Sequence, residues 1–152
     1  MGDAFPAELW QGIEAFNQGH FYACHDILEA IWFQAEEEDK KFYQGILQIA
    51  VGLYHFGNGN WRGAVILMGE GLSRLQGYLP DYAGLDLEQL TQDAGDLLST
   101  LQNLGADRVG DLVLLAPEDD AAIDPATTDK TLQEKVIRSR PIIQKVAPLG
   151  EE

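Results

Sequence analysis

The chain repeats one helix-turn-helix pattern at an offset of 40 residues. The first copy is FNQGHFYACHDILEAI, from Phe16, and the second is FGNGNWRGAVILMGEG, from Phe56. Each copy contains a helix end, a turn with Asn and Gly, an aromatic residue and a second amphipathic helix. A helical hairpin cannot bury its apolar face alone, so repetition at this period is typical of helical-repeat proteins. The sequence therefore predicts an all-α, compact, tetratricopeptide-like bundle built from helical hairpins.

Apolar residues recur at helical spacing throughout residues 1–102, and no stretch there alternates as a half-buried strand would. Five helices are predicted, at residues 6–17, 20–35, 40–56, 61–79 and 87–101. We interpret the acidic run at residues 36–39 as a connector whose charge favours the start of the third helix. Gly45 and Gly52 share one face of that helix, where another helix, or a second copy of the chain, can approach closely.

The composition changes after residue 102, so residues 1–102 are predicted to form the bundle and residues 103–152 a C-terminal extension. The segment LGADRVGDLVLL is expected to hold a turn and a short strand or helical turn. The next segment, APEDDAAIDPATTDK, has the composition of a linker. The last residues are expected to form an extended arm that lies on the domain or on a partner subunit.

Acidic residues outnumber basic ones by 25 to 10, which gives a net charge of −15. This charge opposes phosphate backbones and anionic lipids, so neither nucleic acid nor a membrane is an expected partner. Cys24 is the single cysteine, which excludes an internal disulfide and favours a small buried thiol. The N-terminus, MGDAFPAELW, lacks the charged and apolar segments of a secretory signal. A cytoplasmic protein is therefore expected.

Several polar residues occupy otherwise apolar helices. His25 and Glu29 lie one turn apart in the second helix, and Trp32 follows on the next turn. Gln44, Gln48 and His55 form a polar stripe along the third helix. If the two helices are antiparallel neighbours, these groups converge on one pocket between helices two, three and four. Asn60 and Arg62 begin the fourth helix, where Asn60 suits an N-cap and Arg62 requires a carboxylate such as Glu29 or Asp26.

Three interpretations of this pocket stay open. In the first, Glu29 and His25 only fix helix packing, although a buried carboxylate is costly unless it is fully partnered. In the second, His25, Glu29 and His55 hold a divalent metal of the zinc, iron or manganese kind, because two imidazoles and a carboxylate suffice as ligands. In the third, His25 is a general base that Glu29 orients, without a metal.

The ordered motifs resemble one family. They are FNQGHFYACHDILEAIW, FYQGILQIAVGLYHFGNGNWRGA and GLSRLQGYLP, and together they are similar to the domain-of-unknown-function family numbered 309. The resemblance covers about residues 8–100 and implies a small all-helical fold, but no reaction. The residues that match the family pattern are His25, Glu29, Trp32, Gln44, Gln48, His55, Asn60, Arg62, Gly63 and Ala64. Trp61 departs from it, because the family usually has a smaller residue or proline there.

These observations favour a module that binds a small ligand, a partner protein or a peptide through the polar pocket. A metal-dependent hydrolase that uses His25, Glu29 and His55 is the first alternative. A structural protein, whose polar cluster only fixes packing, is the second. No cofactor is implied beyond the candidate divalent metal, and a homodimer is compatible with the glycine face of the third helix.

Overall fold

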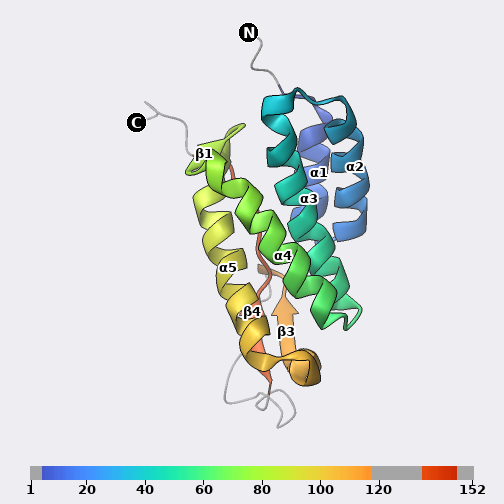
Figure 1. Cartoon of the computed structure of the whole chain (residues 1–152), viewed down its shortest axis with the longest axis vertical. Helices are drawn as coiled ribbons and strands as arrows, with labels where there is room; N and C mark the ends of the chain where they lie inside the picture. The colour runs from blue at the N-terminus through green and yellow to red at the C-terminus, as the bar shows by residue number, and fades with distance from the viewer. Residues whose placement is uncertain (1–4, 118–134, 147–152) are drawn as a thin grey trace.

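The computed structural model describes residues 5–117 and 135–146. Five α-helices lie in these ranges: α1 (Glu8–Asn17), α2 (Phe21–Gln34), α3 (Glu37–Gly57), α4 (Trp61–Leu75) and α5 (Leu87–Leu104). Two 3-10 turns, η1 (Gln76–Tyr78) and η2 (Ala106–Asp111), follow α4 and α5. The strands β1 (Asp81–Tyr82) and β2 (Leu85–Asp86) pair antiparallel, whereas β3 (Leu112–Leu115) and β4 (Val136–Ser139) pair parallel. The predicted all-α class is confirmed (Figure 1).

The repeated sequence gives the same turn twice. Gly19 and Gly59 have φ angles of 82° and 75°, in the left-handed region that glycine adopts without strain. The following amides, those of His20 and Asn60, each donate to the carbonyl five residues back at 2.8 Å. This pattern ends the α1 and α3 helices by satisfying their last carbonyls. The repeat is therefore present in the backbone, whereas the tetratricopeptide-like arrangement stays a prediction.

Helices α3 and α4 approach each other through glycines. A Cβ atom on Gly71 would lie 2.6 Å from the carbonyl oxygen of Gly45, and one on Gly52 would lie 3.2 Å from the carbonyl oxygen of Ala64. The predicted close approach to Gly45 and Gly52 is thus made by α4. Because α4 fills this face within the chain, the two glycines are not available to a second copy.

Among the predicted helix ends that differ from the structure, two have a clear physical explanation. Glu37, Glu38 and Asp39 belong to the first turn of α3, so the connector after α2 is shorter than the acidic run suggested. Carboxylates are favourable at the positive end of a helix, which explains why these residues extend it. The fourth helix ends at Leu75 and continues as η1 to Tyr78. Leu79 is then extended, because the residue before a proline is sterically disfavoured from helical geometry.

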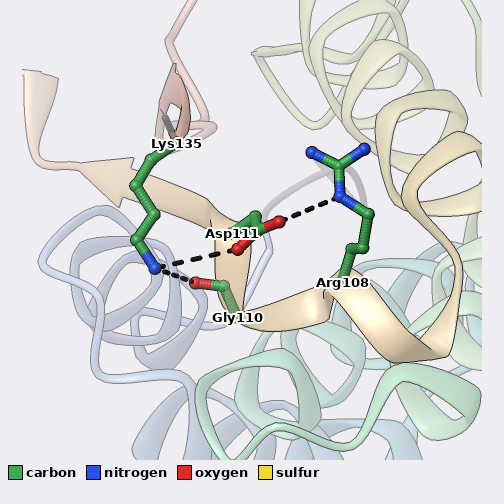
Figure 2. Close-up of polar contacts among 4 residues, drawn as sticks. All are labelled: Arg108, Gly110, Asp111 and Lys135. Carbon is green, nitrogen blue, oxygen red and sulfur yellow. Dashed lines mark hydrogen bonds and ion pairs between the residues drawn. The ribbon is translucent and has the colours of Figure 1, made fainter. Parts of the chain in front are cut away.

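The C-terminal arm, defined here as residues 135–146, lies on the bundle rather than apart from it. Its start is held at η2, where Asp111 lies between Arg108 and Lys135, as Figure 2 shows. Its end reaches the β1–β2 turn, where the Val146 amide donates to the Gly84 carbonyl at 3.0 Å. The arm predicted from the sequence is therefore extended and packed on the domain.

Some sequence predictions concern residues outside the described ranges. Most of the linker-like segment falls on residues 118–134, and the first four residues of MGDAFPAELW also lie outside. The domain boundary at residue 102 stays a prediction, and α5 continues past it to Leu104. Among the described residues, no helix is long and apolar enough to cross a membrane.

Candidate functional site

The predicted pair His25 and Glu29 forms on the surface of α2. His25 Nε2 lies 3.5 Å from Glu29 Oε2, and His25 Nδ1 lies 3.2 Å from Asp26 Oδ1. The Glu29 side chain is 49% exposed, whereas that of His25 is 22% exposed. The imidazole therefore lies between two carboxylates that water reaches. The closed packing cluster that the first interpretation required is not formed by these residues.

His55 belongs to a different cluster, at the turn between α3 and α4. Asn60 Oδ1 accepts the Gly63 N–H at 2.9 Å, so Asn60 is the predicted N-cap of α4. The other side of the same amide, Nδ2, then lies 3.3 Å from His55 Nδ1, which must accept this hydrogen bond. A Cβ atom on Gly63 would lie 2.9 Å from the His55 ring, so glycine is required there. This cluster stabilises the turn.

The predicted metal ligands do not converge. Among the described residues, no group of three His, Cys, Asp or Glu side chains could hold a metal ion. His25 and Glu29 are neighbours through helix geometry, while His55 is held by Asn60 at the end of α3. The predicted set of His25, Glu29 and His55 is therefore corrected, because the polar stripe of α3 bonds α4 and the turn before it, where Gln48 meets Glu70 and His55 meets Asn60.

Gln48 makes a polar network with α4 instead of α2. Its Nε2 donates to Glu70 Oε1 at 3.1 Å, and its Oε1 accepts from Arg74 Nε at 2.8 Å. Gln48 is 9% exposed, so this network satisfies a buried amide across the α3–α4 interface. The expected proximity of Gln48 to Glu29 is not observed. Arg62 is exposed, and among the described residues it forms no ion pair with Glu29 or Asp26.

Trp32 and Gln44 are each half-buried. Lys40 Nζ lies 4.7 Å from the Trp32 ring centroid and also donates to the Trp32 carbonyl at 3.2 Å, which caps the end of α2. The Trp32 indole N–H is buried and has no hydrogen-bond partner among the described residues. Gln44 likewise forms no hydrogen bond within the described ranges. Neither side chain meets the His25 pair.

A groove of about 920 Å³ lies elsewhere, between α1, the end of α2, the start of α3 and the β1–β2 turn. We call it the acidic groove. The residues that line it are Phe5, Pro6, Glu8, Gln11, Ile27, Ala30, Ile31, Gln34, Ala35, Glu36, Glu38, Asp39, Tyr43, Tyr82 and Ala83. Among these described lining residues none is basic, and four carry a carboxylate: Glu8, Glu36, Glu38 and Asp39. Its volume lies in the range of sites that bind drug-sized ligands or a few side chains.

Two tyrosines also line the acidic groove. Tyr43 is 2% exposed, and its hydroxyl has no hydrogen-bond partner among the described residues. Burial, together with the nearby Asp39 carboxylate, raises the pKa of Tyr43 to about 12, so it is a donor at neutral pH. The Tyr82 hydroxyl already donates to Asp39 Oδ1 at 2.5 Å, and this hydrogen bond raises the pKa of Tyr82.

The acidic groove was not predicted from the sequence, because neither of its two signals is specific to a groove. An acidic run such as residues 36–39 is also typical of a solvated connector. Apolar residues on a helix usually indicate core positions, yet only Cys24 and Leu28 are fully buried in α2. Ile27 and Ile31 line the groove instead. A helix with apolar residues on two faces, one in the core and one outside it, indicates a second packing surface.

The structure is thus a small all-α bundle with a groove that apolar, aromatic and acidic side chains line. Residues 9–67, from α1 into α4, match the family model described as a domain of unknown function, DUF309. The family resemblance inferred from the sequence is thereby confirmed over this segment, which is shorter than the predicted range of 8–100. The family description states no activity.

Two curated relatives are similar to this chain. An uncharacterized protein of Aquifex aeolicus (strain VF5) is 29% identical over 102 residues, which cover 66% of this chain and 31% of the relative. The uncharacterized protein YpuF of Bacillus subtilis (strain 168) is 33% identical over 85 residues, which cover 55% of this chain and 46% of YpuF. The chain thus matches less than half the length of each relative.

Proposed function

We propose that this protein is a binding module whose acidic groove receives an amphipathic helix of a partner protein, with basic residues beside the helix's apolar stripe. The groove itself carries the proposal: an apolar floor with carboxylates on its rim and no basic group among the described lining residues. A binding role was also expected from the sequence, but at the polar pocket between helices two, three and four instead of at this groove.

The spacing of the lining residues supports a helical occupant. Ile27, Ala30, Ile31 and Gln34 recur along α2 at the spacing of one helix face, and Glu8 and Gln11 do so on α1. Two helix faces side by side form a trough into which a third helix places apolar residues one turn apart. The same packing explains why Ile27 and Ile31 stay only partly buried at the edge of the bundle core.

The rim carboxylates support a cationic partner. Glu8 lies on α1, whereas Glu36, Glu38 and Asp39 lie at the junction of α2 and α3, so negative charge borders two sides of the trough. Opposite charge on a partner speeds association and fixes its orientation, more than it adds raw affinity. Because the whole chain carries −15, the field around it also favours cations.

The test uses the full chain and a designed peptide that has Leu on one helical face and Lys on the other. We expect fluorescence anisotropy to detect binding that weakens with salt. Ala30→Tyr fills the groove and should weaken binding at least about tenfold, the loss typical of a blocked contact at the centre of an interface. Ala23→Tyr is the matched control, because Ala23 is exposed on the same helix, two turns away, and does not line the groove.

Equal weakening by Ala30→Tyr and Ala23→Tyr would contradict the proposal, because peptide binding would then follow the general negative charge. Both variants should keep the helical circular dichroism of the wild type, since both positions are exposed. A small amphipathic amine, such as dodecylamine below its micelle concentration, is the comparison ligand. Two results together would assign the groove to small molecules instead. The amine would compete with the peptide for the wild-type groove, and the affinity of the peptide would not depend on its helicity.

A further inference from the structure

A second groove has the opposite charge. It has a volume of about 750 Å³ and lies between α1, the start of α2 and the C-terminal arm. We call it the basic groove, and it is lined by Trp10, Ile13, Glu14, Asn17, Gln18, His20, Ala116, Arg140, Ile143 and Lys145. Two of these lining residues, Arg140 and Lys145, are cationic, and His20 adds an imidazole. Glu14 is the one carboxylate among them. In a chain of net charge −15, this is a local reversal.

Arg140 is fixed in this groove by the end of α1. Its Nη2 donates to the Asn17 carbonyl at 2.8 Å, which satisfies one of the last carbonyls of the helix. A Cβ atom on Gly19 would lie 3.1 Å from Nη1, so the guanidinium rests against the turn. Arg140 Nε is buried without a partner, and Nη1 has no hydrogen bond among the described residues. The guanidinium is thus held in position, and among the described residues its Nε and Nη1 have no hydrogen-bond acceptor.

Lys145 and His20 approach the same space from two other directions. Lys145 Nζ lies 4.7 Å from the Trp10 ring centroid, which orients the ammonium at the edge of the groove. His20 is the N-cap residue of α2 and makes no side-chain cap, and the first turn of α2 contains no acidic residue. The partial positive charge of this helix end therefore adds to that of the side chains rather than being neutralised.

We propose that the basic groove binds the phosphate group of a small organic phosphate. A phosphate monoester carries nearly two negative charges and offers oxygens to several donors at once, which suits cations that approach from separate segments. Arg140 supplies a fixed donor, Lys145 a mobile charge and His20 a third nitrogen. Glu14 opposes the anion and limits its affinity. This site is distinct from the acidic groove and does not depend on the function proposed for it.

Isothermal titration calorimetry of the full chain with phenyl phosphate tests the proposal. We expect Glu14→Gln to tighten binding roughly threefold to tenfold, as the loss of one opposing charge at a partly exposed site predicts. Glu8→Gln removes the same charge from the same helix but outside the basic groove, and should leave the affinity unchanged. A gain of affinity cannot arise from misfolding, so this pair of variants isolates the site.

Lys145→Gln should weaken binding by a similar factor, while Lys41→Gln, an exposed lysine on α3, should not. Equal effects of Glu14→Gln and Glu8→Gln would overturn the proposal, because the anion would then respond only to net charge. Absence of saturable binding at millimolar phenyl phosphate would also overturn it. Benzoate, which carries one charge on the same ring, should bind more weakly; equal binding of benzoate would overturn the assignment to phosphate.

Discussion

Asn17 and Ile143 are joined by two hydrogen bonds although 126 residues separate them in the sequence. Asn17 Nδ2 donates to the Ile143 carbonyl at 2.9 Å, and Asn17 Oδ1 accepts the Ile143 N–H at 2.7 Å. One side chain thus replaces a strand partner for the arm at the point where Ile143, 3% exposed, enters the core. The Asn17 side-chain amide thus attaches the C-terminal arm to the end of α1, beside the hydrogen bond from Arg140 to the Asn17 carbonyl.

Asn17→Ala should detach this part of the arm without unfolding the bundle. The substitution leaves the Ile143 N–H and carbonyl without partners, at a cost of about 1–3 kcal/mol. Hydrogen exchange should then become faster at Ile143 and at Asp86, whose amide donates to the Gln144 carbonyl, while α3 amides stay protected. Asn58→Ala is the control, since Asn58 follows α3 in the second copy of the turn and is exposed. Unchanged exchange at Ile143 would contradict the role of Asn17.

Two glycines of α4 should respond to alanine in opposite directions. A Cβ atom on Gly71 would meet the Gly45 carbonyl oxygen at 2.6 Å and the Ile49 backbone nitrogen at 3.0 Å, so Gly71→Ala should cost about 1–3 kcal/mol by overpacking. A Cβ atom on Gly69 meets its nearest neighbour, Leu98 Cδ2, at 3.9 Å. Gly69→Ala should therefore stabilise the helix by up to about 1 kcal/mol. Urea denaturation of both variants measures the difference, and equal effects would refute the close packing.

The sequence predicted the helices well because their signals are local. Apolar spacing, the two Asn and Gly turns and Pro80 each act within a few residues, and Gly45 and Gly52 did indicate a close helix contact. The position of the arm is a different matter. It depends on Asn17 and on Arg140, residues more than a hundred positions apart, and no local pattern relates them. Long-range pairing of this kind has no periodicity to detect.

The stability of the protein should fall above pH 9 because of Cys24. Burial raises the pKa of its thiol from 9.0 to about 12, so the folded state keeps the proton that the unfolded state loses. Stability from this group is complete below pH 9.0 and decreases as pH rises toward 12. Between pH 8 and 10.5 the Cys24 thiol alone should account for a loss of about 2 kcal/mol, to which Tyr43 and Tyr82 add because their pKa values are also raised. Denaturation at both pH values measures it, and Cys24→Ala should reduce the loss by that amount. An equal loss in Cys24→Ala would contradict this cause.

Glu29→Ala should have a small effect on stability, within about 0.5 kcal/mol, because exposed pairs one helix turn apart contribute little. A closed packing cluster would instead lose several kcal/mol when one partner of a buried pair is removed. Thermal unfolding of Glu29→Ala separates the two cases. Gln48→Ala is the comparison, since it leaves Arg74 without its acceptor inside the α3–α4 interface, and it should be clearly more destabilising.

The site was harder to predict than the fold, because its residues belong to three different segments. His25 and Glu29 were paired correctly from helix geometry, and the N-cap role of Asn60 was also correct. The register between α2 and α3 does not follow from the length of the acidic run, since most of that run is helical. His55 is separated from His25 because its ring lies against Asn60 and Gly63 at the start of α4. The acidic groove involves the β1–β2 turn as well, and no pattern in the sequence relates Tyr82 to Asp39.

Tyr43→Phe separates binding from folding at the acidic groove. The Tyr43 hydroxyl has no hydrogen-bond partner among the described residues, so its removal should leave the free energy of unfolding unchanged or slightly raised. If the hydroxyl donates to the bound helix, the affinity for the Leu and Lys peptide should fall, by about 0.5–1.5 kcal/mol for one hydrogen bond. Tyr82→Phe is the matched control, because the Tyr82 hydroxyl is already used by Asp39. It should lower stability and have less effect on peptide affinity. Loss of stability in Tyr43→Phe, with unchanged affinity, would mean that this hydroxyl serves the fold and not the groove.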